Sequence, residues 1–267
     1  MNPTCHWTGQ LGQKGNWLLH ANITNANVSY LGENVNDGIG WKLAGGGDVN
    51  RDGYDDFLIP SFQNSKGGNF AGQTYLILGK RDGWNKSIQL SKADASFIGY
   101  THEESGFSVA MGDFNGDGYS DILIGAPYNS ERGIEVGKIY LFFGSPQKWS
   151  MNTPLQDADI KFYGEKPEDY AGISVASAGD VNGDGIDDIL ISAEGNSDGG
   201  KNSGKTYLIL GHRYNWTDMN LSDADASFVG IYPDELSGSA ISSLGDINGD
   251  GLDDFAISLD FRELESS

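Results

Sequence analysis

Four short segments of the chain carry oxygen-bearing side chains at alternate positions. In each segment, aspartate or asparagine occupies positions 1, 3, 5 and 9, and position 6 is glycine. A glycine at this point permits a sharp turn that directs the backbone carbonyl of position 7 toward the side-chain oxygens. An all-oxygen set with about three negative charges suits a hard divalent ion of calcium size, whereas magnesium prefers strict octahedral geometry and its own water. The spacing therefore predicts calcium binding.

The segments, called loops 1 to 4 below, predict four Ca2+ sites with five protein ligands each. The predicted ligands are Asp48, Asn50, Asp52, Tyr54 and Asp56 in loop 1; Asp113, Asn115, Asp117, Tyr119 and Asp121 in loop 2; Asp180, Asn182, Asp184, Ile186 and Asp188 in loop 3; and Asp246, Asn248, Asp250, Leu252 and Asp254 in loop 4. Position 12 is isoleucine in every loop, whereas an EF-hand loop requires glutamate there, so that type of site is excluded. A metal-free Asp-Gly hairpin is the alternative for a single loop. Four acidic loops without cations, however, would each be destabilised by charge repulsion.

The loops recur at a nearly constant interval, which is typical of a repeat architecture. Their first aspartates are 65, 67 and 66 residues apart, and Trp17, Trp84, Trp149 and Trp216 follow at 67, 65 and 67. Each interval contains a small-residue segment before the loop, a continuous apolar run after it, and two further strand-like segments. The third interval of the pattern, for example, reads "AGISVASAG", "DILISA", "GKTYLILG" and "ASFVGI". We therefore expect one all-β domain over residues 1–267, a β-propeller of four-stranded antiparallel blades.

The repeats begin and end within a blade. We expect blades over about 39–100, 106–165, 172–231 and 238–260, with the last blade completed by residues 4–34. In this arrangement "TCHWTG" is a degenerate third strand, and the two ends of the chain share one blade and close the ring, which removes exposed strand edges. The alternatives are that the boundaries fall there by chance, that two copies pair into an eight-bladed homodimer, or that the blades belong to a longer ring.

The segment "FSVAMGDFNGDGYSDILIGAP", residues 107–127, resembles the FG-GAP repeat of integrin alpha-subunit propellers. Gly106 and Phe107 stand at its start, and Gly125, Ala126 and Pro127 at its end. The resemblance covers nearly the whole chain, and it implies a calcium-bearing β-propeller with a role in extracellular adhesion and ligand binding. This chain supplies four repeats rather than seven, and it has "IPS" at 59–61, "SAE" at 192–194 and "SLD" at 258–260. Ring size and ligand are therefore not carried over. Similar repeats also occur in many microbial surface proteins.

The formal net charge of −21 makes nucleic acids and anionic membranes unfavourable partners. No apolar run reaches transmembrane length, so we expect no membrane insertion. Residues 1–15 lack the features of a secretion signal, and the single Cys5 permits no intrachain disulfide. Calcium sites of moderate affinity would be empty at cytosolic calcium levels, which favours an extracellular or cell-surface location.

We expect a protein or glycan ligand to bind the loop face opposite the calcium turns, because variable loops on a rigid scaffold usually carry recognition. Loops on that face contain an acidic set that forms either a rim for a basic partner or merely a solvated surface: Glu103, Glu104, Glu165, Glu168, Asp169, Asp234 and Glu235. The periodic tryptophans are expected to pack on the outside of the blades rather than to stack on sugars. The four histidines fall at unrelated repeat positions, so we expect no enzyme. A polysaccharide-active, lyase-like propeller and a purely structural module remain the alternatives.

Overall fold

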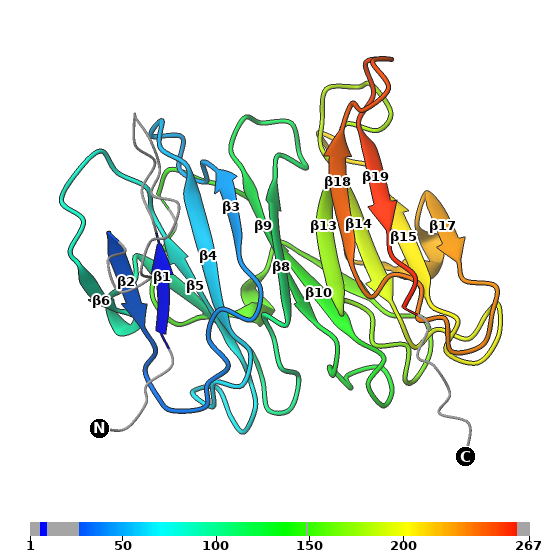
Figure 1. The fold of residues 1–267 in the computed structure, drawn as a ribbon, viewed down its shortest axis with the longest axis horizontal. Helices are drawn as coiled ribbons and strands as arrows, with labels where there is room; N and C mark the ends of the chain where they lie inside the picture. Colours follow the sequence, from blue (N-terminus) through cyan, green and yellow to red (C-terminus); the bar gives the residue numbers. More distant parts are fainter. Residues whose placement is uncertain (1–5, 10–26, 148, 261–267) are drawn as a thin grey trace, which may run out of the picture.

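The computed structural model describes residues 6–9, 27–147 and 149–260, whose regular structure is almost entirely β (Figure 1). Three sheets share the same core of four antiparallel strands, which confirms the predicted all-β repeat. Sheet 1 contains β3 (Ala44–Gly47), β4 (Asp56–Ser61), β5 (Gln73–Ile77) and β7 (Ala95–Ile98); sheet 2 contains β8 (Ser108–Gly112), β9 (Asp121–Ala126), β10 (Lys138–Phe142) and β12 (Ile160–Tyr163); sheet 3 contains β13 (Ser174–Gly179), β14 (Asp188–Ala193), β15 (Lys205–Ile209) and β17 (Ala226–Val229). No helix in these residues is long and apolar enough to cross a membrane.

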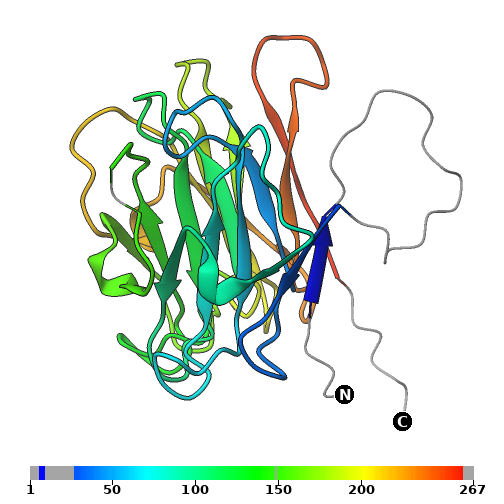
Figure 2. The ribbon, with the colours of Figure 1, turned by 90° about the vertical axis from the view of Figure 1, so that its left-hand side faces the viewer.

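The sheets stand side by side and pack face to face (Figures 1 and 2). The first strands of neighbouring sheets contact each other, and their small residues permit this close approach. The second strands β9 and β14 are buried at every residue, as their continuous apolar sequences predict. Leu123 and Ile139 of sheet 2 share one buried cluster with Ile189 and Tyr207 of sheet 3. The main cores therefore lie between sheets, an arrangement consistent with a β-propeller.

Three of the fourth strands, β2, β7 and β12, are each extended by a short parallel strand from the following repeat, which the sequence did not predict. These added strands are β6 (Ser87–Gln89) on β2, β11 (Thr153–Pro154) on β7 and β16 (Met219–Asn220) on β12. A 3-10 turn follows each of them: η2 (Leu90–Lys92), η3 (Leu155–Asp157) and η4 (Leu221–Asp223). Trp84, Trp149 and Trp216 precede these strands and pack against three different core clusters. This confirms the packing role predicted for them, whereas Trp17 and Cys5 lie outside the described residues.

The two ends of the chain form separate partial sheets. Strand β1 (His6–Gly9) is antiparallel to β2 (Val28–Leu31), which agrees with its prediction as a third strand. Strand β18 (Ile241–Gly245) pairs with β19 (Asp254–Ile257) as a two-stranded sheet. The structure does not pair these two partial sheets with each other: β1 bonds to β2 and β19 to β18, and the partial sheets lie at opposite ends of the row (Figure 1). The structure thus contains an open row of sheets.

Candidate functional site

All four acidic loops lie along the same edge of the row of sheets, at the top of Figure 1. Each loop connects the first strand of a repeat to the second, and its position-9 aspartate is the first residue of that second strand. Loops 1, 3 and 4 each follow a β-bulge, in β3, β13 and β18, which bends the strand just before the turn. The repeat therefore places four loops of the same design in equivalent positions.

Within each loop, aspartate and asparagine oxygens are held over the turn by backbone N–H groups. In loop 2, the Asp113 carboxylate accepts hydrogen bonds from the backbone N–H of Asp117 at 3.1 Å and Gly118 at 2.8 Å. Asn115 Oδ1 accepts from Asp117 N at 2.9 Å, and Asp117 Oδ1 accepts from Tyr119 N at 2.9 Å. The same contacts recur in loops 1, 3 and 4. The side chains at positions 1, 3 and 5 are thus preorganised around one turn.

The position-9 aspartates are buried at the base of loops 1 to 3. Both carboxylate oxygens of Asp121 accept backbone hydrogen bonds, from Phe114 N at 2.9 Å and Gly144 N at 2.8 Å. Burial raises the pKa of Asp121 to about 8 despite these bonds, and repulsion from Asp113 and Asp117 adds to the shift. Burial likewise raises the pKa of Asp56 and of Asp188 to about 6. A cation in the loop would offset this accumulated negative charge.

The donor chemistry of the loops fits calcium. Within residues 27–147 and 149–260, no three carboxylate, imidazole or thiol side chains gather into a metal site. Each loop offers instead a mixed all-oxygen set: carboxylates at positions 1 and 5, an amide oxygen at position 3 and a carbonyl at position 7. The position-9 carboxylate already accepts backbone hydrogen bonds, so its predicted role as a ligand would use its remaining lone pairs. A bound calcium ion would supply positive charge and cross-link the two ends of the turn.

Three of the seven acids expected at the surface of the opposite loops are buried instead. Glu103, Asp169 and Glu235 are only 2%, 3% and 3% exposed, so the reading of these three residues as a rim or a solvated surface is wrong. Each carboxylate accepts backbone hydrogen bonds within its own loop, as in Tyr100 N to Glu103 at 2.8 Å. Glu104, Glu165 and Asp234 are partly exposed, and Glu168 is exposed. The buried acids fix the loop shape.

Each of three buried acids also binds an asparagine that the sequence reading missed. The pairs are Asp37 with Asn64 at 2.9 Å, Glu103 with Asn129 at 2.6 Å and Asp169 with Asn196 at 2.9 Å. The asparagine follows the acid by 27, 26 and 27 residues. Aligning the repeats could have revealed this constant spacing. These bonds join the loop before each sheet to the loop between that sheet's second and third strands.

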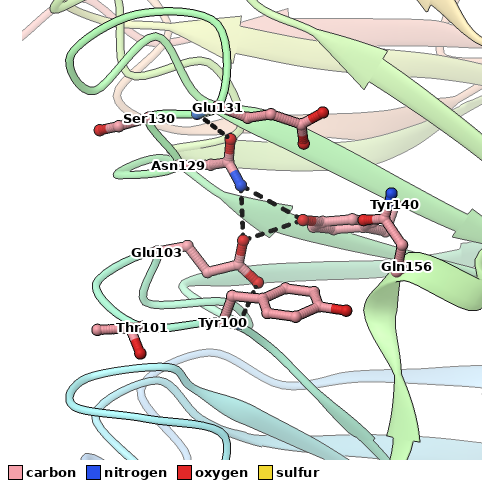
Figure 3. Close-up of a pocket in the computed structure, with 8 residues that line it drawn as sticks. All are labelled: Tyr100, Thr101, Glu103, Asn129, Ser130, Glu131, Tyr140 and Gln156. Atoms are coloured by element: carbon pink, nitrogen blue, oxygen red, sulfur yellow. Dashed lines mark hydrogen bonds between the residues drawn. The ribbon is translucent and has the colours of Figure 1, made fainter.

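A polar pocket of about 430 Å³ opens at one of these loop pairs, between sheets 1 and 2 (Figure 3). It is lined by Tyr100, Thr101, Glu103, Asn129, Ser130, Glu131, Tyr140 and Gln156. The Tyr140 hydroxyl donates to Glu103 at 2.9 Å, and burial raises the pKa of Glu103. The Tyr100 side chain is 47% exposed, so the pocket presents carboxylate, amide and hydroxyl groups beside an accessible aromatic ring.

The equivalent crevices in the neighbouring repeats are crossed by lysine ion pairs. Lys66 contacts Glu33 at 3.6 Å before sheet 1, and Lys166 contacts Asp198 before sheet 3. Between sheets 1 and 2, Tyr100 stands where two other repeats have Glu33 and Glu165. Glu131 pairs instead with Lys138 of β10. Among the described residues, no ion pair therefore joins the two loops that flank the pocket.

A row of aromatic rings lies along the same loops. Neighbouring ring centroids are 5.3 to 6.2 Å apart, and most pairs meet edge to face. The rings belong to Trp41, Phe62, Phe107, Tyr128 and Tyr170. Trp41 is 62% exposed, so the row reaches the surface. Trp41, Phe107 and Tyr170 come from the loops before sheets 1, 2 and 3, whereas Phe62 and Tyr128 come from the loops between the second and third strands of sheets 1 and 2. The row therefore crosses from one repeat to the next.

The FG-GAP repeat family model matches residues 105–142 and 171–209. The chain is 30% identical over 210 residues to integrin alpha-PS2 of Drosophila melanogaster, a match that covers 75% of this chain and 13% of that relative. It is 32% identical over 183 residues to integrin alpha-5 of Xenopus laevis, which covers 67% of this chain and 15% of the relative. A third relative is phosphatidylinositol-glycan-specific phospholipase D of Bos taurus, 31% identical over 62% of this chain and 20% of that protein.

The chain thus spans at most a fifth of the length of these relatives. The two matched segments contain loops 2 and 3 together with the first three strands of sheets 2 and 3. Loops 1 and 4 share their hydrogen-bond pattern, although the family model does not match them. Both the repeat motif and the similarity to integrin alpha chains point to the same conclusion: the chain is an FG-GAP repeat protein of the integrin alpha-like type.

Proposed function

We propose that this chain is a calcium-binding β-propeller-type module that binds a protein or glycan ligand outside the cell or at the cell surface. The observation that carries the proposal is the recurrence of one hydrogen-bonded oxygen set in four loops. In this role calcium pins each turn between a first and a second strand, and the stabilised sheets present the loops of the opposite face to a ligand. The expected extracellular setting follows from the need for calcium above cytosolic levels.

Calcium binding is tested by calorimetric titration of calcium-depleted protein. Free calcium at a hundredfold excess over the dissociation constant adds about 2.7 kcal/mol of stability per independent site. We therefore expect chelation to lower the melting temperature strongly, and Asp184→Ala to weaken loop 3 and sheet 3 specifically. Asp82→Asn, which alters an exposed acid outside the loops, is the matched control. A melting temperature that does not change with excess chelator would contradict the calcium proposal.

The ligand site we propose is the pocket at Tyr100 together with the aromatic row. Planar amide and carboxylate groups beside an exposed ring can hold either a peptide or a sugar by hydrogen bonding and stacking. The test is retention of the calcium-loaded protein on protein and glycan arrays, with Tyr100→Ala expected to reduce the signal. Ile134→Ala, at an exposed apolar residue outside the pocket, is the control. Undiminished retention of the Tyr100→Ala variant would exclude the pocket.

An enzymatic role is a second candidate, favoured by the similarity to a protein named as a phospholipase D. A polysaccharide-active, lyase-like activity is the related alternative for a propeller of this kind. Incubation with glycan polymers and with glycan-linked phospholipids, followed by product analysis, separates these activities from simple binding. A purely structural module would be inactive in these assays and in the arrays.

We also infer that the partial sheets at the two ends complete each other. By analogy with the registers of β4 with β5 and of β5 with β7, β1 would pair with β19 so that Thr8 stands opposite Ile257. Such pairing could arise within one chain after closure, or between two chains in a homodimer. The molar mass in solution, measured with and without calcium, distinguishes these arrangements.

A further inference from the structure

Neighbouring acidic loops are joined by a reciprocal pair of hydrogen bonds, which we call a clasp. Between loops 2 and 3, Asp187 N donates to Asp113 O at 3.1 Å, and Asp113 N donates to Asp187 Oδ2 at 2.9 Å. Between loops 3 and 4, Asp253 N donates to Asp180 O and Asp180 N donates to Asp253 Oδ2, both at 2.9 Å. Position 8 of one loop thus binds the backbone of position 1 in the preceding loop.

The first pair of loops has the same clasp with a serine in place of aspartate. Ser120 N donates to Asp48 O at 3.0 Å, and Asp48 N donates to Ser120 Oγ at 3.2 Å. The clasp therefore needs a side-chain oxygen acceptor at position 8 rather than a carboxylate charge. This natural replacement also supplies a conservative substitution for the other two loops.

A glycine before each clasped aspartate makes room for the clasp. A Cβ atom at Gly112 would lie 2.9 Å from Asp187 Oδ2, and one at Gly179 would lie 2.1 Å from Asp253 Oδ2. A Cβ atom at Gly47 would lie 2.9 Å from Ser120 Oγ. At Gly245, before loop 4, the same added atom meets nothing within 4 Å. The close approach thus accompanies the clasp at loops 1 to 3.

The clasp binds the residue whose carboxylate holds the preceding loop in shape. The carboxylate of Asp113 organises loop 2 through the N–H groups of Asp117 and Gly118, while its backbone N–H and C=O are both bound by Asp187. On the other side, Asp187 lies between positions 7 and 9 of loop 3, both predicted metal ligands. An ion that fixes those two positions also fixes Asp187.

We propose that Ser120, Asp187 and Asp253 are positioning residues that couple each metal loop to its neighbour. This inference rests on the proposed calcium binding. An ion in loop 3 restricts Asp187, and the clasp then holds Asp113 where loop 2 needs its first ligand. Loop 2 consequently loses less conformational freedom when it binds its own ion, which is positive coupling between sites. Position 1 of loop 4, Asp246, has no such clasp among the described residues, so loop 4 is expected to bind most weakly in the open row of sheets.

Terbium luminescence is expected to report chiefly on loops 1 and 2. Tb3+ replaces calcium in oxygen sites, and a nearby tyrosine sensitises its emission; position 7 is Tyr54 in loop 1 and Tyr119 in loop 2 but Ile186 and Leu252 in loops 3 and 4. In a Tyr54→Phe background the sensitised signal reports loop 2. The Tyr119 ring also lies 5.6 Å from the Arg51 guanidinium of loop 1. The assignment is therefore verified when Asp117→Asn, in loop 2, abolishes the signal and Asp52→Asn, in loop 1, does not.

The decisive variant is Asp187→Ala. The substitution lies in loop 3, and its effect is measured as the affinity of loop 2 for terbium. We expect it to weaken terbium binding at loop 2 by about three- to tenfold, as for the loss of one hydrogen bond. Asp187→Ser should restore the affinity, because Ser120 makes the same clasp. Asp55→Ala is the matched control, since Asp55 holds the same motif position in loop 1, is exposed and has no clasp in the described structure.

A second arm leaves the clasp intact and removes the ion from loop 3. Asp184→Asn should weaken loop 2 binding although Asp187 is unchanged, and this arm stays informative if Asp187→Ala folds poorly. If the parent protein binds terbium normally and both variants keep the same loop 2 affinity, the coupling is refuted but the calcium proposal is not. An equal loss in Asp55→Ala also overturns the coupling, because the effect would then be general. If the parent protein binds neither terbium nor calcium, the calcium proposal fails and the coupling with it.

Discussion

The side-chain amide of Asn129 donates to the carboxylate of Glu103 at 2.6 Å, across the gap between two loops that are 26 residues apart in sequence. The same carboxylate accepts hydrogen bonds from Tyr140 Oη and Tyr100 N. Three donors therefore converge on one buried acid that forms the floor of the pocket (Figure 3). The arrangement links loop shape, pocket shape and the packing of sheet 2.

Glu103→Ala is expected to destabilise the protein by about 2 to 4 kcal/mol, because it leaves buried donors without an acceptor. Chemical denaturation with urea, followed by tryptophan fluorescence, measures this loss. Glu168→Ala, at an exposed glutamate of the corresponding loop in the next repeat, should change stability by no more than about 0.5 kcal/mol. Equal effects of the two substitutions would contradict a special role for the buried acid.

The calcium-depleted protein should become more stable as the pH falls from about 8 to about 5. Asp121 has a folded-state pKa of about 8 against an ordinary value of 3.8. Between those values the folded state binds a proton that the unfolded state lacks, so acidification favours folding. Asp56 and Asp188, with pKa values of about 6, add to this effect below pH 6. With saturating calcium the dependence should reverse, because protons compete with the ion for the carboxylates.

Thermal unfolding at several pH values, in metal-free buffer and with millimolar calcium, measures both slopes. Asp121→Asn should flatten the metal-free profile between about pH 6 and 8, where Asp121 is the acid expected to titrate. Metal-free stability that rose with pH across this window would contradict the burial argument.

Much of the fold was predictable because the same sequence signals recur at a nearly constant interval. The apolar run "DILIGA" and the small-residue strand before it are local signals, and both strands formed where expected. The parallel strand β11 was not predictable, because Thr153 and Pro154 carry little strand signal and pair with β7 of another repeat. Ring closure was inferred from the matching ends of the chain, and the structure holds those ends in separate sheets.

The acidic loops and the buried acids show where local patterns suffice and where they fail. The loops are built from contacts within nine residues, so their oxygen set could be predicted from spacing alone. Glu103 was misjudged because glutamate is rarely buried unless paired, and its partner Asn129 belongs to a different loop. The clasp of Asp187 with Asp113 was equally invisible, since it spans 74 residues.

Trp216→Ala is expected to reduce stability by about 2 to 4 kcal/mol, somewhat less than for a fully buried tryptophan. Trp216 stacks on His212 at 4.2 Å between ring centroids and contacts Phe143 and Phe162 edge to face. Its removal leaves a cavity on the outside of sheet 2 but does not alter the pocket residues. Urea denaturation should therefore show reduced stability of the variant, whereas its retention on the arrays should be unchanged. A loss of glycan binding without a loss of stability would instead favour sugar stacking.

Gly125→Ser is expected to destabilise the contact between sheets 2 and 3 by about 1 to 3 kcal/mol through overpacking. A Cβ atom at Gly125 would lie 2.2 Å from Gly172 O and 2.4 Å from Ser108 Oγ, so the backbone of the neighbouring sheet must move. The corresponding residue of sheet 3 is Ser192, whose hydroxyl donates to Ser174 O at 3.2 Å. Ser192→Gly should thus have a smaller effect, about 1 kcal/mol, from the lost hydrogen bond. Urea denaturation of both variants checks the order, and a larger loss in Ser192→Gly would show that the approach of Gly172 does not limit the size of residue 125.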